Sequence, residues 1–280
     1  MLGAMPSAEF RFYEELNDFL APGKRKRAFR QDYPAGATVK HIIEALGVPH
    51  TEVELILVNG VSVDFAYPVR NDDRVSIYPK FEAFDITSLL RVRSRPLREP
   101  RFIADAHLGG LARRLRMLGF DVLYSNGYRD AEVAAIARAG ERIVLSRDRA
   151  LLMQKTISHG CYVRASRPPA QLAEILARLD LWGSVRPFTR CMRCNALLEP
   201  VAKEAVLGQL PPRTAQFYAR FWKCSGCHLA CNSTFRFHSF KPNGSVLFPG
   251  DQTFREGKDS GHSCSNFEPD QVILGKHFFE

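Results

Sequence analysis

The 280-residue sequence has no hydrophobic run that approaches the length of a membrane span. Its first residues, MLGAMPSAEF, lack the charged segment and the apolar run of a secretory signal. Cysteine is scarce and odd in number, with 7 residues, which suits a reducing cytosol better than an oxidising exterior. These absences argue against a membrane or secreted protein. We therefore expect a cytoplasmic protein with no membrane partner.

Acidic residues are outnumbered, with 30 Asp and Glu against 39 Lys and Arg and a net charge of +9. An excess of this size favours polyanionic partners, nucleic acid before an anionic membrane. The alternative is that the charge only keeps the protein soluble. Hydrophobic residues make up 45% of the chain, so its length is sufficient for two or three domains with real cores.

The few cysteines include two C-x-x-C pairs about 30 residues apart, Cys191 with Cys194 and Cys224 with Cys227. Each pair can fold as a tight turn that presents two sulfurs to the same side, and two such turns make the four-thiolate cage that zinc favours. The alternatives are two redox pairs or two disulfides. A structural zinc would explain how residues 186–230 fold, but it leaves any catalysis to another part of the chain.

Residues 8–85 read as strand, strand, helix, strand, strand, which is a β-grasp order. A strand begins at Phe10, Thr38 precedes a helix that stops at Gly47, the Asn59-Gly60 turn follows 54–58, and a last strand covers 74–79. A basic run, KRKR at 24–27, lies between the first two strands. The segment resembles the ubiquitin-like sulfur-carrier proteins, but the chain runs on where they end in a free Gly-Gly. Sulfur transfer is therefore not expected.

Three further segments follow. Residues 86–101 form a linker with Arg91, Arg93 and Arg95 among its arginines. This linker either binds successive phosphates of a nucleic acid or is only exposed to solvent. Residues 102–182 alternate short apolar strands with helices, which predicts a parallel sheet covered by helices on both faces. Within 186–230 we expect a helical insert at about 214–221, and residues 231–280 read as an irregular tail.

Acidic residues follow the strands of the predicted parallel sheet: Asp105 after the first, Asp130 and Glu132 after the second, and Asp148 after the third. Carboxyl ends of parallel strands meet at one rim, where active groups gather. A divalent cation would relieve the repulsion among converging carboxylates, and hard oxygen ligands indicate Mg²⁺ or Mn²⁺. The alternative for each aspartate is a helix cap. A carboxylate-bound cation suits hydrolysis of phosphodiesters.

Arginines accompany these acids. The basic residues predicted to hold a nucleic-acid backbone are Arg113, Arg114 and Arg116 after the first acid, and Arg147 and Arg149 on either side of Asp148. The alternative is that they form ion pairs with the carboxylates.

Two stretches make the resemblance specific: FIADAHLGGLARRLRMLGFD at 102–121 and IVLSRDR at 143–149. Both resemble the Mut-seven C-terminal RNase family, a branch of the PIN-like nucleases with a zinc ribbon that matches the four cysteines. The resemblance implies an α/β PIN-like sheet, a preceding ubiquitin-like domain, and a metal-dependent ribonuclease whose acids are Asp105, Asp130 and Asp148, with Glu132 as a fourth. The residues after Cys227 depart from the family pattern, which leaves the last ribbon strand open.

The leading hypothesis is therefore a ribonuclease that acts on RNA, which we expect to be single-stranded, with Mg²⁺ or Mn²⁺ at the acids and zinc in the ribbon. The runner-up is a non-catalytic RNA-binding adaptor in which the acids are residual. The ubiquitin-like segment is a candidate site for a protein partner in either case.

Overall fold

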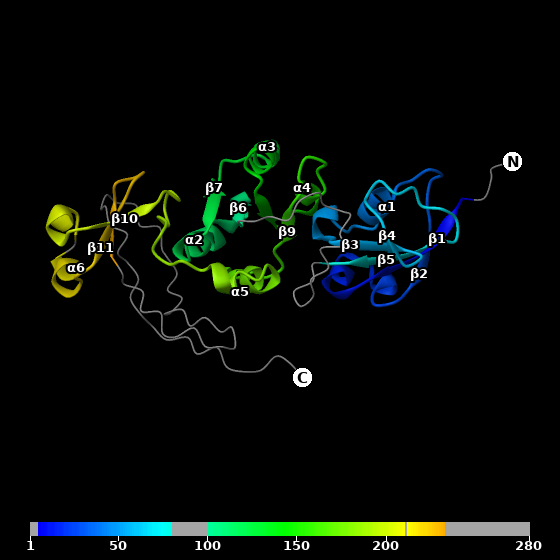
Figure 1. Cartoon of the computed structure of the whole chain (residues 1–280), viewed down its shortest axis with the longest axis horizontal. Coiled ribbons are helices and arrows are strands. Elements are labelled where there is room, and N and C mark those ends of the chain that lie inside the picture. Colours follow the sequence, from blue (N-terminus) through cyan, green and yellow to red (C-terminus); the bar gives the residue numbers. More distant parts are fainter. Residues whose placement is uncertain (1–4, 80–99, 211, 233–280) are drawn as a thin grey trace, which may run out of the picture. The chain divides into compact units, whose positions relative to one another are not determined.

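The computed structural model describes residues 5–79, 100–210 and 212–232 (Figure 1). By its contacts the chain forms two compact units, one of residues 1–109 and 123–164, the other of 110–122 and 165–280. Most of the predicted linker 86–101, with Arg91, Arg93 and Arg95, and the predicted tail beyond residue 232 lie outside the described residues. Within the part that is described, no helix combines the length and the apolar character needed to cross a bilayer.

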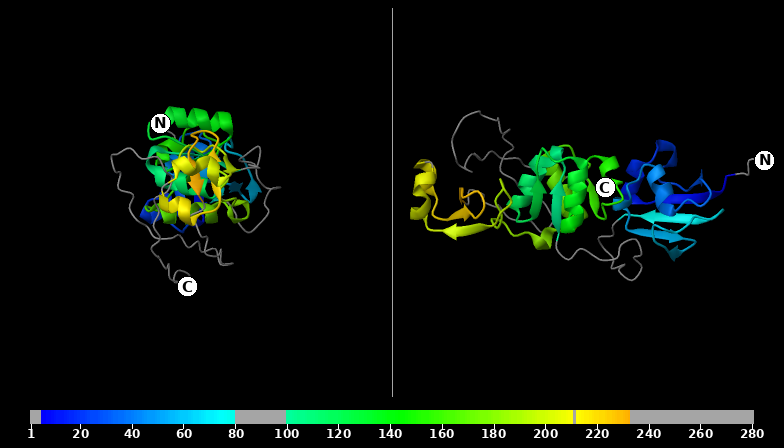
Figure 2. Two further views of the ribbon diagram at one scale, coloured as in Figure 1. Left: turned by 90° about the vertical axis from the view of Figure 1, so that its left-hand side faces the viewer. Right: turned by 90° about the horizontal axis from the view of Figure 1, so that it is seen from above.

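The N-terminal part is a β-grasp, as the sequence predicts. Its five-stranded sheet has the order β2-β1-β5-β3-β4, with β1 parallel to β5 and the other pairs antiparallel. The helix α1 packs on one face (Figures 1 and 2). The elements are β1 (Ser7–Phe12), β2 (Phe29–Asp32), α1 (Val39–Ala45), β3 (Leu55–Val58), β4 (Val61–Ser62) and β5 (Arg74–Tyr78). The short β4 was not predicted.

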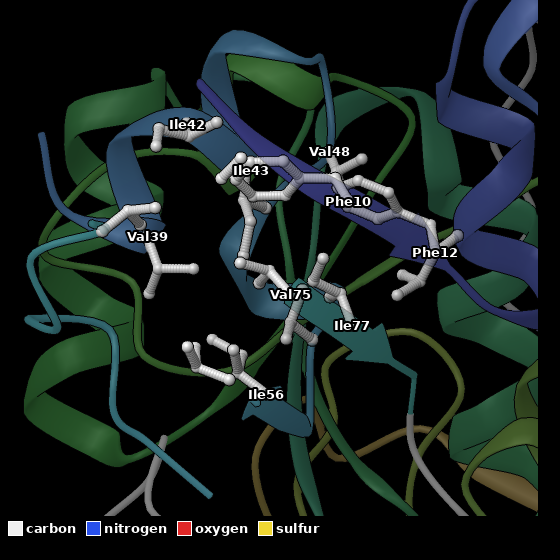
Figure 3. Packing of buried hydrophobic residues seen from close by; sticks show 14 of the residues in the cluster. Phe10, Phe12, Val39, Ile42, Ile43, Val48, Ile56, Val75 and Ile77 are labelled. Atoms are coloured by element: carbon white, nitrogen blue, oxygen red, sulfur yellow. The ribbon is translucent and has the colours of Figure 1, made fainter. Parts of the chain in front are cut away.

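Alternation along the strands decides which face of this sheet α1 covers. In β1, Phe10 and Phe12 are buried while Arg11 between them is exposed, because successive side chains of a strand point to opposite faces. Figure 3 shows the two phenylalanines with residues of α1, β3 and β5 in one apolar core. The predicted Asn59-Gly60 turn joins β3 to β4, and both residues have the positive φ angles, 49° and 84°, of a tight hairpin.

The second sheet has the order β7-β6-β8-β9, and β6 is parallel to β8 as β8 is to β9. This confirms the predicted parallel sheet flanked by helices. The strands are β6 (Arg101–Ala104), β7 (Asp121–Tyr124), β8 (Ile143–Ser146) and β9 (Gly160–Tyr162), and the helices are α2 (Gly109–Met117), α3 (Asp130–Gly140), α4 (Arg149–Leu152) and α5 (Pro168–Arg178). In the first unit, α3 and α4 pack on β6 and β8 through one apolar cluster.

A buried carboxylate joins the β-grasp to the edge strand β9 within the first unit. The side chain of Glu52, in the short 3-10 helix η3 (His50–Glu52), is fully buried. Its Oε1 accepts the backbone N–H of Tyr162 at 2.5 Å, and its Oε2 lies 3.3 Å from Nη2 of Arg164. Arg164 also pairs with the exposed Asp18, with 3.2 Å between Nε and Oδ2. One guanidinium therefore has one buried and one exposed acidic partner.

These two partners allow a matched test of stability. We expect Glu52→Ala to lower the free energy of unfolding by about 2–3 kcal/mol, because the N–H of Tyr162 loses its buried acceptor and Arg164 loses its buried partner. We expect Asp18→Ala to cost less than about 1 kcal/mol, since exposed pairs contribute little. Urea unfolding of the two variants measures the difference, and equal effects would contradict the buried role of Glu52.

The C-terminal described part is a three-stranded antiparallel sheet with the order β10-β11-β12. Its strands are β10 (Leu198–Val201), β11 (Phe221–Cys224) and β12 (Ala230–Asn232). The last ribbon strand, which the sequence left open, is therefore present, and Cys231 lies in it. The helix predicted at about 214–221 is found as α6 (Pro212–Phe217), which ends earlier, and the 3-10 helix η7 (Lys203–Gln209), which was not predicted, precedes it.

Candidate active site and metal centre

Two of the predicted acids lie where the strand order of the second sheet reverses. The chain passes from β6 to β7 on one side of β6 and later returns to β8 on its other side. Asp105 directly follows β6, and Asp148 comes two residues after the end of β8. The carboxyl ends of strands at such a switch point are where open parallel sheets place their ligands.

Ser146, the last residue of β8, connects these two acids. Its side chain is completely buried. The hydroxyl donates to Oδ2 of Asp105 at 2.8 Å and accepts the backbone N–H of Asp148 at 2.8 Å. Sequence analysis did not single out Ser146. The available signal was a hydroxyl at the buried end of a strand, because such a group must find hydrogen-bond partners.

Both acids also cap helices, as the alternative interpretation of the sequence predicted. Asp105 Oδ1 accepts the N–H of Ala106, and Asp148 Oδ1 accepts that of Ala150 at 2.7 Å. Capping does not exclude a second role, because each carboxylate oxygen has two lone pairs. The two roles are therefore compatible in this arrangement.

The other two predicted acids are placed differently. Asp130 is the exposed first residue of α3, in the connection that follows β7. Glu132 Oε2 accepts the backbone N–H of Arg129 at 2.8 Å, and this bond holds the pKa of Glu132 below its usual value. Glu132 thus completes the cap of its own helix. Across 5–79, 100–210 and 212–232, the one group of three or more candidate metal ligands consists of the four cysteines.

The arginines predicted to bind nucleic acid differ in their exposure and in their contacts. Arg113 and Arg147 are exposed, and Arg114 is half-buried with Nη1 at 3.3 Å from the carbonyl of Gly110. The guanidinium of Arg149 lies 4.9 Å from the ring centroid of Phe19 in the β-grasp.

Arg116 requires a correction. It is 4% exposed, and its guanidinium donates to the carbonyls of Val122, Met192 and Arg193. Burial lowers the pKa of Arg116. It is therefore a structural residue that holds the first cysteine turn, and the expectation that it contacts nucleic acid is wrong.

The four cysteines form a compact sulfur cluster. Their Sγ atoms all lie within 4.8 Å of one another, with 3.7 Å between Cys191 and Cys227 and 3.3 Å between Cys194 and Cys224. Tetrahedral zinc with bonds of about 2.3 Å separates its sulfurs by about 3.8 Å. The donor set and its spacing therefore fit a structural zinc.

The two cysteine turns are built alike. The sulfur of Cys191 accepts the N–H groups of Arg193 and Cys194, and the sulfur of Cys224 accepts those of Gly226 and Cys227. Each turn ends in a residue with positive φ directly after its second cysteine, Asn195 at 71° and His228 at 58°. Backbone N–H groups that point at sulfur stabilise the thiolate that binds metal.

Cys231 adds a fifth thiol beside this cluster. A hydrogen bond with Cys231 is the main reason that the pKa of Cys191 is lowered to about 4. Burial raises the pKa of Cys227 to about 12.

Hydrogen bonds of the Asn195 side chain connect the Cys191–Cys194 turn to the start of β7 in the second unit. Its side chain accepts the N–H of Val122 at 3.0 Å and donates to Asp121 at 2.8 Å. Together with Arg116, it gives the first cysteine turn two sets of bonds to residues 116–122.

Comparisons with known proteins identify two family models. Residues 100–230 match the family model described as Mut7-C RNAse domain, and residues 5–85 match Mut7-C ubiquitin. Among solved structures, the crystal structure of H. volcanii small archaeal modifier protein 1 is 19% identical, with coverage of 27% of this chain and 99% of that one and a TM-score of 0.23. That of SAMP1 from Haloferax volcanii is 19% identical, with 28% and 99% coverage and a TM-score of 0.23. No curated protein matches the chain.

Proposed function

Because residues 100–230 match the Mut7-C RNAse domain and residues 5–85 match the Mut7-C ubiquitin domain, we propose that the chain hydrolyses phosphodiester bonds of single-stranded RNA. Asp105 and Asp148, with Asp130 as a third ligand, would hold Mg²⁺ or Mn²⁺. The observation that carries the proposal is the shared Ser146 hydroxyl, which joins Asp105 to the backbone of Asp148 at the switch point of the sheet.

The residues present fit this chemistry. Carboxylate oxygens are the ligands that Mg²⁺ and Mn²⁺ prefer. When bound, such a cation activates water and neutralises charge on the phosphate. Ser146 fixes the orientation of the Asp105 carboxylate, and the exposed Arg147, which directly precedes Asp148, can position phosphates near the acids.

The direct test is cleavage of an end-labelled single-stranded RNA by the full chain, with and without Mn²⁺. Cleavage that requires the cation supports the proposal. An adaptor without catalytic activity would bind the same RNA and leave it intact under both conditions, and that result would overturn the assignment as an enzyme.

Ser146 provides a more specific prediction. We expect Ser146→Ala to lower cleavage by about 10- to 100-fold, as loss of a group that orients a metal ligand typically does. We also expect it to raise the Mn²⁺ concentration needed for half-maximal activity, because Asp105 loses its fixed orientation. Ser146→Thr keeps the hydroxyl and should restore the cation dependence. A purely structural Ser146 would leave that dependence unchanged in the alanine variant.

A further inference from the structure

The cations Lys24, Arg25, Lys26 and Arg27, here called the basic loop, form a surface distant in sequence from the acids. We propose that the basic loop binds phosphates of single-stranded RNA and that Tyr13, whose neighbours in the chain share the hydrogen-bonding partner Asn17 with the loop, stacks on a base. The choice of RNA rests on the proposed function. The surface itself rests on the charge and geometry of the β-grasp.

The basic loop presents its charge to solvent. Arg25, Lys26 and Arg27 are exposed, and Lys24 is half-buried. Among the described residues, no carboxylate forms an ion pair with any of the four. Arg30 and Arg74 on the same domain, in contrast, pair with Asp72 and Glu9. Four consecutive cations without acidic partners are complementary to a polyanion.

A buried amide fixes the backbone of the basic loop. Asn17 is 5% exposed, and its Oδ1 accepts the N–H of Lys26 at 2.6 Å. Its Nδ2 donates to the carbonyls of Phe12 and Glu14, each at 3.0 Å. Lys26 has a φ of 56°, an unusual angle for a lysine that these bonds support. A loop held in this way loses little conformational entropy when a ligand binds.

The side chains at the start of the basic loop are also held. Nζ of Lys24 lies 4.9 Å from the ring centroid of Phe29 and donates to Gln31 at 2.6 Å. Nε of Arg25 donates to the carbonyl of Leu20 at 2.8 Å. Lys26 and Arg27 have no such side-chain bonds among the described residues, so their charged ends are available to a ligand.

The same amide also bonds to the backbone on both sides of an aromatic residue. Phe12 and Glu14, the two residues that Asn17 binds, stand on either side of Tyr13. The Tyr13 ring stacks on Tyr78 with 4.2 Å between centroids and 12° between planes. The guanidinium of Arg11 lies 5.0 Å from the Tyr13 centroid. Cations along a backbone together with aromatic rings are typical of surfaces that bind single strands.

An acidic protein is the competing occupant. It would satisfy the cations, whereas a single-stranded RNA would satisfy them and also stack a base on an aromatic ring. The hydrogen bonds of Asn17 to the basic loop and to the residues around Tyr13 therefore favour RNA.

The test measures binding without cleavage. The full chain with Asp105→Asn is titrated, without divalent cation and at several salt concentrations, into a fluorescein-labelled single-stranded RNA of about 16 nucleotides. The loop variant adds Lys26→Gln and Arg27→Gln, which break no described contact. The matched control instead adds Arg70→Gln and Arg74→Gln, which remove the same amount of charge. Arg70 precedes β5 and Arg74 is its first residue, so neither lies at the end of the strand where Tyr78 stacks on Tyr13.

We expect the loop variant to bind RNA about tenfold more weakly and its log–log salt slope to flatten by about 1.4, since each phosphate contact to a single strand contributes about 0.7. We expect Tyr13→Leu to weaken binding about tenfold without a change of slope, and Tyr13→Phe to bind like the parent. The control should keep the parent affinity.

Three results would overturn the inference: unchanged affinity and slope in the loop variant, equal losses in loop variant and control, or parent-like binding by Tyr13→Leu together with equally tight binding of poly-glutamate. The proposed function is tested separately. If the native chain fails to cleave RNA with Mn²⁺ but binding depends on the basic loop, the inference stands and the enzyme assignment falls.

Discussion

Asp105→Asn should reduce cation-dependent RNA cleavage by at least about a thousandfold, because a metal ion contributes several kcal/mol of transition-state stabilisation and an amide is a poor substitute ligand. The measurement is the single-turnover cleavage rate of a labelled single-stranded RNA at saturating Mn²⁺. The fold should survive, since the amide oxygen of asparagine can still accept the N–H of Ala106 and its NH2 group can donate to the Ser146 hydroxyl oxygen, which has two lone pairs.

Asp32→Asn is the matched control for this variant. Asp32 is an exposed aspartate on β2 of the β-grasp, and the same substitution there should leave the rate unchanged. If Asp105→Asn cleaves at the native rate, the metal site is not at the switch point. If both variants lose activity equally, the loss reports a general effect and not a ligand.

Removal of zinc should have the largest structural effect. Structural zinc contributes about 10–16 kcal/mol of apparent binding free energy in small zinc domains, and that energy is also folding energy. A strong chelator, or Cys194→Ser, should therefore abolish amide protection in β10, β11 and β12 as followed by hydrogen exchange. The strands β6 and β8 should retain their protection, because they form their own core with α3 and α4.

Cys231→Ser is the control that distinguishes a cysteine that binds zinc from a cysteine that only lies beside the cluster. Cys231 bonds to Cys191 but lies outside the group of four. The Cys231→Ser protein should retain one zinc per chain, and the Cys194→Ser protein should retain much less after dialysis. Equal zinc loss in the two variants would mean that the cage is not the one assigned from the two C-x-x-C turns.

Most strands of the two larger sheets could be predicted because their signals are local. The Asn59-Gly60 turn and the alternation in β1 both depend on a few neighbouring residues, and the structure agrees with them. The cysteine cluster was predictable for the same reason, since each turn is encoded within four residues. Helix ends were harder to predict: α3 ends not through a left-handed glycine but through Glu141, with a φ of 48°.

Roles that depend on distant contacts could not be predicted. Arg116 appears in the sequence as one of several arginines on a helix, and only the fold brings it to the carbonyls of Met192 and Arg193. Glu52 likewise belongs by sequence to the β-grasp, although it bonds to Tyr162 about 110 residues later. Sequence patterns report periodicity and short motifs, whereas such long-range hydrogen bonds follow from topology.

The bond between Glu52 and Tyr162 also bears on self-association. β9 is an edge strand of its sheet, and exposed edges are templates on which other chains add strands and aggregate. Here the buried carboxylate of Glu52 accepts one N–H of that edge, from Tyr162, and places a negative charge beside the strand. A version of the chain without residues 5–79 would expose β9 to neighbouring molecules. Its solubility, rather than its active-site chemistry, would then set the concentration at which the isolated nuclease part could be handled.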